Sequence, residues 1–211
     1  YCPYNWRFWW DFGTGETGNW GCHTLDIPYW ALGLSHAERV DLDVVPKASE
    51  IDSQRTPRKM QSRLEFASSA DGKRPPLSVH WWHGGPRKEV FSKYGAEPKL
   101  VLFVGEKGTI SADFGGYSAR MFDGSDPVVP AESIARSPGF HQEWIGAAKG
   151  GQRATCDFVD YSGPLAEGVL LANAAWRSGG GFDWDSKAFK PSGNGRAEEF
   201  IHSEFREGWK V

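Results

Sequence analysis

The sequence is poor in cysteine and methionine, with 3 Cys and 2 Met among 211 residues. Cys2, Cys22 and Cys156 lack the Cys-x-x-Cys spacing of a zinc ligand pair or a redox motif. Three cysteines also cannot all pair with one another, so neither a disulfide framework nor a cysteine zinc site is indicated. We expect buried thiols in a protein of a reduced compartment.

Long apolar runs and an excess of positive charge are also missing. No apolar run approaches the ~18 residues that cross a bilayer, so the sequence predicts no transmembrane helix. The chain has 24 Lys and Arg against 27 Asp and Glu, and the basic residues form no run. Without a basic patch, we expect neither nucleic acid nor a membrane among its partners.

The residues that are present describe one folded domain over residues 1–211. Hydrophobic residues make up 39% and aromatic residues 14% of the chain, which is typical of a globular protein. The first residues contain no basic stretch followed by an aliphatic stretch, so no signal peptide is predicted. The chain opens on aromatic residues without an initiating Met, and we expect a fragment of a longer protein in an unknown compartment, cytoplasmic or exported.

The spacing of apolar residues changes along the chain. Period-two alternation predicts strands at 40–44, 62–69, 77–82, 100–104, 109–112, 182–184 and 188–190. Apolar residues three and four apart predict helices over 19–34, which Pro28 should kink or restart, and over 140–149 and 163–177. The polar stretch 46–61 reads as a loop. Consecutive strands with short turns predict an α+β fold, a largely antiparallel open sheet with helices packed on one face.

Residues 1–17 are predicted to form an aromatic and glycine-rich loop, and its end overlaps a Gly-x-Gly-x-x-Gly motif at 13–18. This motif opens the first helix, as in a dinucleotide site. However, the residues before it are bulky and charged, whereas the first strand of a parallel sheet is aliphatic. Trp20 would crowd a pyrophosphate, and hairpins follow in place of a second βαβ unit. We therefore interpret the motif as a hinged loop and expect no cofactor site in this chain.

Asn19 and His23 are four residues apart, so on a helix they share one face. A histidine in the first turns is disfavoured in its protonated form by the helix dipole, which suits a general base. Asn19 is either the N-cap or a partner for a substrate hydroxyl. The alternative is a histidine satisfied within the core.

These residues belong to a wider resemblance. The run NWRFWWDFGTGETGNWGCHTLDIPYWALGL, together with WIGAAKGG, DYSGPLAEGVLLANAAWRSGG, FDWD and FREGW, resembles the C-terminal domain of the glucose-fructose oxidoreductase / inositol dehydrogenase (Gfo/Idh/MocA) family. The resemblance implies an NAD(P)-dependent oxidoreductase of sugars or polyols, a missing N-terminal Rossmann domain that holds NAD or NADP, and a homo-oligomer formed through the sheet face.

The resemblance also assigns roles. Members carry an Asp-x-x-x-His pair, so His23 is expected to accept the substrate proton, with Asn19 standing in place of the aspartate. The family's lysine in a Glu-Lys-Pro segment has no match; Lys107 lies in a predicted hairpin turn. Asp26, three residues past His23, could orient the imidazole, and a local hydrogen bond is the alternative.

Further candidates are aromatic or polar. Sugar rings stack on aromatic faces, so Trp6, Arg7, Trp10 and Asp11 are candidate substrate-binding residues, although packing against a partner domain explains them equally well. His141 could border the substrate pocket, or simply belong to a polar first turn. The alternative functions are a noncatalytic carbohydrate-binding or assembly module and an NAD-dependent glycoside hydrolase.

His80 and His83 form a His-x-x-His pair, which is a possible pair of metal ligands. On a strand, however, residues three apart point to opposite faces. We therefore predict two exposed sheet residues and no metal. By the same alternation Trp81 and Trp82 should face opposite sides, one in the core.

Overall fold

The computed structural model describes residues 3–84, 88–202 and 205–209. The chain divides into two compact units. Unit 1 comprises Tyr1–Gly85 and Leu165–Val211, and unit 2 comprises Pro86–Pro164. Unit 1 is thus assembled from two separate stretches of the chain, and unit 2 from one continuous stretch.

Unit 1 contains a five-stranded sheet in which every neighbouring pair is antiparallel. Its strand order is β3-β2-β1-β7-β8. The strands are β1 (Arg39–Leu42), β2 (Met60–Phe66), β3 (Leu77–His83), β7 (Phe182–Asp185) and β8 (Lys190–Ser192). Val40 of β1 pairs with Leu64 on one side and with Phe182 on the other, so strands from both stretches of the chain complete the sheet.

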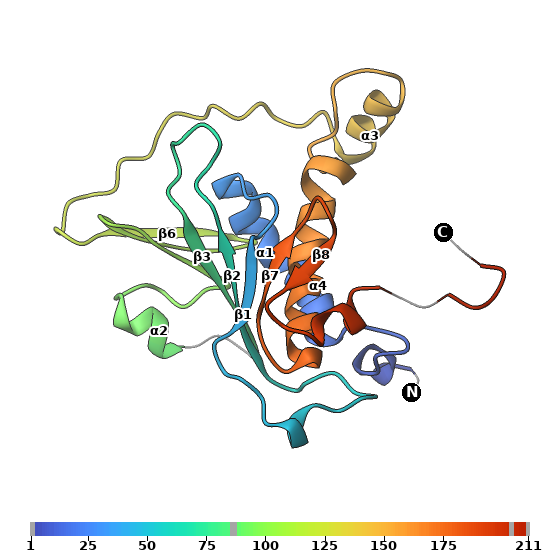
Figure 1. Ribbon diagram of the computed structural model, residues 1–211. Coiled ribbons are helices and arrows are strands. Elements are labelled where there is room, and N and C mark those ends of the chain that lie inside the picture. The colour runs from blue at the N-terminus through green and yellow to red at the C-terminus, as the bar shows by residue number, and fades with distance from the viewer. Residues whose placement is uncertain (1–2, 85–87, 203–204, 210–211) are drawn as a thin grey trace. The chain divides into compact units, whose positions relative to one another are not determined.

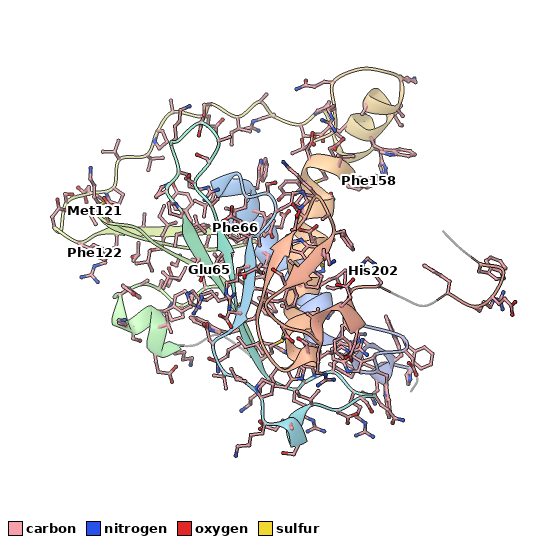
Figure 2. The ribbon with its side chains drawn as sticks, viewed as in Figure 1. Glu65, Phe66, Met121, Phe122, Phe158 and His202 are labelled. Atoms are coloured by element: carbon pink, nitrogen blue, oxygen red, sulfur yellow. The ribbon has the colours of Figure 1, made fainter. Side chains whose placement is uncertain are left out.

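Alternation along the strands separates a core face from an outer face. On β2, buried and half-buried residues alternate from Met60 to Phe66. Figure 2 labels Glu65 and Phe66, consecutive residues of this strand; Phe66 is 3% exposed and belongs to the core. The other large core residues of the sheet are Val40, Leu42, Met60, Leu64, Trp81, Phe182 and Trp184.

Two helices cover the core face, α1 (Gly15–Leu32) and α4 (Gly163–Ser178), which lie on the same side of the sheet (Figure 1). The Tyr29 ring of α1 meets Phe66 edge-on at 5.6 Å. A Cβ at Gly168 of α4 would lie 2.2 Å from the Tyr29 hydroxyl oxygen and 3.2 Å from Leu64 Cδ1. Only glycine leaves room for this approach, which brings both helices down onto β2. The prediction of helices on one face of an antiparallel sheet is confirmed.

Both helices end in the same way. Gly33 after α1 has a φ of 57° and Gly179 after α4 a φ of 82°, the left-handed conformation that favours glycine. The following residues close the ends: the Leu34 N–H donates to the Tyr29 carbonyl and the Gly180 N–H to the Ala175 carbonyl. α1 does not restart at Pro28, which lies inside it.

The outer face of the five-stranded sheet carries a ladder of charged side chains. Arg39 bonds Asp183 at 2.8 Å and Asp41 at 3.1 Å. Arg63 bonds Asp43 at 3.0 Å and Glu65 at 2.5 Å. The hydrogen bond to Glu65 raises the pKa of Arg63, although its partial burial opposes this.

His80 and Ser78 extend the charged ladder onto β3. His80 Nδ1 lies 2.7 Å from Asp43, and the Ser78 hydroxyl donates to Glu65. The ladder therefore spans β7, β1, β2 and β3, and this face is polar. Oligomerisation through it stays a prediction.

Unit 2 contains a second, three-stranded antiparallel sheet with the order β4-β5-β6. Its elements are α2 (Lys88–Lys93), β4 (Val101–Val104), β5 (Gly108–Asp113), β6 (Gly116–Met121), α3 (Phe140–Ala148) and the π-helical turn η3 (Phe158–Ser162). Arg120 of β6 donates to the carbonyl oxygens of Tyr94 and Gly95, which fixes the segment after α2 against this sheet. The strands thus form two sheets, where the sequence analysis expected one open sheet.

Three short 3-10 helices complete unit 1: η1 (Asn5–Phe8), η2 (Ala48–Glu50) and η4 (Ala197–Phe200). All three belong to segments without regular strands or long helices.

The expectation of buried thiols is wrong for the two cysteines in the described part of the chain. Cys22 and Cys156 are both exposed. Cys22 lies on α1, whose buried residues include Gly21 and Leu25 but not Cys22. Cys2 lies outside the described residues.

Candidate functional site

The glycine-rich motif at 13–18 does not form a loop but opens α1. Thr14 is the N-cap and Gly15, with a φ of +68°, is the first helical residue. A Cβ at Gly13 would lie 2.7 Å from Arg7 Cα, and one at Gly15 would lie 2.6 Å from the Thr56 hydroxyl oxygen. The glycines thus allow close packing of the protein's own segments. This packing accounts for the glycines at 13 and 15 without a bound dinucleotide, and the absence of a cofactor site stays a prediction.

Asn19 consequently lies in the second turn of α1, and its expected role as N-cap is wrong. The sequence analysis placed the helix start too late because it took the glycines as loop residues. His23 stands in the third turn, where the argument from the helix dipole no longer applies, since that effect is confined to the first turn.

His23 is exposed and Asn19 half-buried, four residues apart on one helix. The alternative of a core histidine is therefore wrong. The Trp20 ring meets the His23 ring edge-on at 6.0 Å. Among the described residues, neither the Asn19 amide nor the His23 imidazole has a hydrogen-bond partner or an ion pair. Both side chains are therefore accessible and can form hydrogen bonds with a ligand.

Asp26 follows three residues after His23 and is half-buried. Its role in orienting the imidazole stays a prediction.

The aromatic segment before α1 packs against the loop 52–56. Trp9 pairs with Arg55 in an isolated β-bridge, and the Trp10 N–H donates to the Gln54 carbonyl at 2.9 Å. The Trp10 indole N–H donates to the Asp52 carbonyl at 3.2 Å. This part of the segment therefore packs within unit 1.

The four candidates of this segment separate into two pairs. Arg7 stacks on the neighbouring Tyr4 ring, 4.0 Å from its centroid, and also lies close to the Trp6 ring. Trp10 and Asp11 instead lie near Arg177 of α4: the Arg177 guanidinium is 4.9 Å from the Trp10 ring centroid and interacts electrostatically with Asp11.

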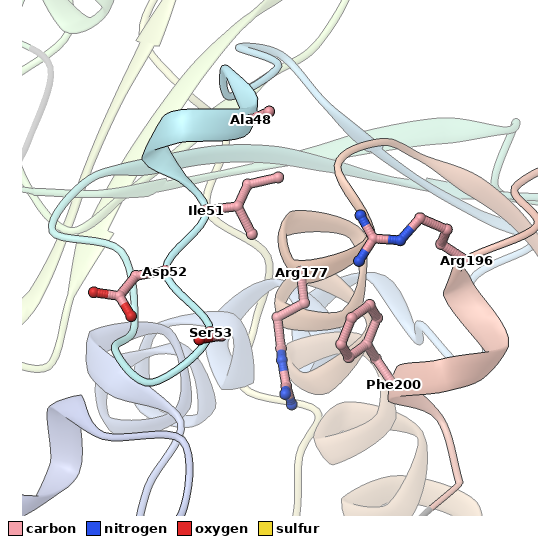
Figure 3. A pocket seen from close by; sticks show the side chains of 7 residues that line it. All are labelled: Ala48, Ile51, Asp52, Ser53, Arg177, Arg196 and Phe200. Atoms are coloured by element: carbon pink, nitrogen blue, oxygen red, sulfur yellow. The ribbon is translucent and has the colours of Figure 1, made fainter.

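Arg177 also borders a cavity of about 230 Å³ in unit 1 (Figure 3). Its lining residues are Ala48, Ile51, Asp52, Ser53, Arg177, Arg196 and Phe200. Sequence reasoning did not single out any of them. Arg177 stands in the last turn of α4, where basic residues are common because they interact favourably with the helix dipole. Its position in the sequence therefore does not mark it as a binding residue; its place in the cavity does.

The remaining histidine candidates lie elsewhere. His141 is an exposed residue of α3 in unit 2, where its ring meets Phe140 at 5.2 Å. Its role in substrate binding stays a prediction.

On β3, His80 is exposed and His83 is 8% exposed, so the expectation that both are exposed is wrong for His83. Burial lowers the pKa of His83, although the Glu16 carboxylate opposes this. Trp81 is buried and Trp82 half-buried, which confirms their placement on opposite faces.

No cluster of three or more His, Cys, Asp or Glu side chains within the described ranges has the arrangement of a metal site. None of the helices found there has both the length and the apolar character to cross a bilayer.

Comparison with known protein families gives no matching family model, and comparison with curated proteins gives no match either.

Proposed function

We propose that this chain is the substrate-binding domain of an NAD(P)-dependent sugar or polyol oxidoreductase, in which His23 accepts a proton from the substrate. The observation that supports this most is the exposed face of α1, where Asn19 and His23 stand one turn apart without partners among the described residues. It agrees with the resemblance, which assigns the reacting pair to these two positions.

The chemistry assigned to this chain is proton transfer. A neutral imidazole nitrogen of His23 would take the hydroxyl proton while the C–H bond beside it is broken. The nicotinamide cofactor, held by a domain other than this one, would accept the hydride. The proposal assigns the binding groups of the cofactor to that other domain, since Gly13 and Gly15 pack against Arg7 and Thr56 of this chain.

Asn19 would position the substrate without changing the charge of the site. Its amide donates and accepts hydrogen bonds, so it can hold a hydroxyl beside the imidazole. It cannot stabilise a protonated His23 by charge, as an aspartate would. We therefore expect the variant Asn19→Asp to raise the pKa that governs turnover.

The test uses the full-length protein that contains this chain. Reduction of NAD or NADP is followed by absorbance over a panel of sugars and polyols. His23→Ala should lower kcat by roughly 100-fold or more, the range of general-base catalysis. His202→Ala, which removes an exposed histidine just after η4, is the matched control. Turnover that survives in His23→Ala would remove the assignment, and analysis of the products separates net oxidation from glycoside cleavage.

A second candidate function is a noncatalytic carbohydrate-binding module. It is favoured by the exposed indoles of Trp6, Trp20 and Trp30, which are 43%, 46% and 57% exposed. Flat aromatic faces in water suit the apolar faces of sugar rings. Oligosaccharide binding that is lost in Trp20→Ala and unaffected in His23→Ala, without any cofactor reduction, would favour this module over the oxidoreductase.

A further inference from the structure

The cavity of unit 1 is formed where three separate segments meet. Its walls come from the segment 48–53, the last turn of α4, and η4 with its N-cap Arg196 (Figure 3). Trp10 does not line the cavity but contacts its Arg177. Its volume of about 230 Å³ is below the roughly 300–1,000 Å³ of pockets for cofactors and drug-sized ligands. It therefore suits a ligand of a few carbon atoms.

Arg177 is the distinctive group of this cavity. Its guanidinium lies 4.9 Å from the Trp10 ring centroid and 4.5 Å from that of Phe200. Aromatic rings contact the flat surface of a guanidinium and leave its N–H groups, which lie in its plane, available for hydrogen bonds. Within the described ranges no hydrogen bond and no ion pair to these N–H groups is formed.

Without a ligand, the environment of Arg177 destabilises its charged side chain. Burial lowers the pKa of Arg177, and the Asp11 carboxylate opposes this without forming an ion pair. A partly buried cation without a direct anionic partner destabilises the fold, because its lost hydration is not replaced. An anion bound to the N–H groups would supply that replacement.

The other polar residues of the lining either supply further hydrogen-bond donors or already form hydrogen bonds within the protein. Arg196 and Ser53 also line the cavity; the Arg196 guanidinium forms a long ion pair with Glu199, at 3.7 Å, and lies 5.8 Å from the Phe200 ring centroid. Asp52 is the one acid in the lining, and its Oδ1 accepts the N–H groups of Gln54 and Arg55 at 2.8 and 3.1 Å. In Figure 3 its carboxylate points away from both arginines.

We propose that this cavity binds a small organic anion, whose carboxylate or phosphate group accepts hydrogen bonds from Arg177 and Arg196. Arginine recognises both groups through paired N–H donors. The site is separate from Asn19 and His23. Gly21 of α1 packs on Val169, and Arg177 follows eight residues later, roughly 12 Å further along α4.

The experiment titrates the protein with inorganic phosphate in one arm and malonate in the other, at constant ionic strength. The indole N–H resonance of Trp10, assigned with Trp10→Phe, reports binding by NMR. We expect saturable shifts, and the arm with the lower Kd identifies the phosphate or the carboxylate class. Arg177→Gln should raise that Kd at least 10-fold, since two charge-assisted hydrogen bonds are lost. Arg153→Gln, an exposed arginine of unit 2, should leave it unchanged.

A urea denaturation curve of each variant distinguishes lost binding from lost structure. If Arg177→Gln does not fold, Arg196→Gln replaces it, because that side chain is 58% exposed and tolerates substitution. It should raise the Kd about 3-fold or more. The proposal is overturned when neither anion shifts the Trp10 resonance, or when a folded variant at 177 or 196 binds as tightly as the wild type.

Discussion

The contact between Tyr29 and Gly168 allows a quantitative test of how α1 and α4 pack on the sheet. The Tyr29 hydroxyl is fully buried, has no hydrogen-bond partner among the described residues, and lies where a side chain at 168 would need to be. Burial raises the pKa of Tyr29, so the hydroxyl stays neutral. Gly168→Ala brings a methyl group to 2.2 Å from its oxygen.

Two opposing effects determine how much Gly168→Ala changes the free energy of unfolding. Replacing glycine by alanine inside a helix stabilises by about 1 kcal/mol. Overpacking a close contact of this kind costs about 1–3 kcal/mol. Because the contact of 2.2 Å is far shorter than real Cβ contacts, we take the upper part of this cost, about 2–3 kcal/mol, and expect Gly168→Ala to lower the free energy of unfolding by about 1–2 kcal/mol.

Removing the hydroxyl should relieve the clash. Tyr29→Phe alone should be neutral or stabilising by up to ~1 kcal/mol, because a buried hydroxyl without a partner is lost. With phenylalanine at 29, the nearest remaining atoms to the new methyl group are 3.2 Å away at Leu64 and 3.3 Å away in the ring. Gly168→Ala should then be nearly neutral, giving a coupling energy of about 1–2 kcal/mol.

Urea denaturation of the two single variants and the double variant, followed by circular dichroism, measures this coupling. Gly146→Ala is the matched control: it lies inside α3 with open space around its Cβ, so it should stabilise by about 1 kcal/mol. Equal effects of Gly168→Ala in both backgrounds, with a coupling below about 0.5 kcal/mol, would refute the described contact.

Three further predictions concern charge and exposure. Arg63→Gln should lower the free energy of unfolding by roughly 1–2 kcal/mol in low salt and by less in 1 M NaCl, since it leaves three carboxylates of the ladder close together; a loss that salt does not reduce would contradict the ladder. His83 has a lowered pKa, so the unfolded chain binds more protons, and stability should fall as the pH drops below about 6.5. His83→Gln should flatten this slope in urea titrations between pH 5 and 7, and an identical slope would count against the buried neutral imidazole. Cys22 should react with Ellman's reagent in the native protein, so Cys22→Ser should lower the number of reactive thiols by one. A Cys22 thiol that reacts only after denaturant is added would contradict its exposure.

Local patterns in the sequence were sufficient for most strands and for the fold class. β2 and β3 are joined by the turn-forming residues 71–76, and β4 and β5 by a turn in which the Gly105 N–H donates to the Gly108 carbonyl. Alternation and turn residues involve only neighbours in the sequence, so strands can be predicted from them before the fold is known. β6 was missed, because after the glycines at 115 and 116 its alternation is weak.

The candidate site was only partly predictable. Asn19 and His23 share a face because both lie on one helix, and helical spacing reveals this. The start of α1 was misplaced because Gly15 requires Thr56 as a packing partner, and the two are far apart in the chain. The Arg177 cavity depends on Ile51, Asp52 and Phe200, which are brought together by the tertiary fold and not by any local pattern.

The order in which strands enter the sheet of unit 1 has a consequence for synthesis on the ribosome. Arg39 of β1 and Asp183 of β7 bond across 144 positions of the chain. The hydrophobic centre around Val40 and Phe182 therefore cannot close until the C-terminal stretch has been translated. Residues 86–164 are contiguous and emerge before residues 165–211, so they can acquire structure while the strands of residues 1–85 still lack β7 and β8.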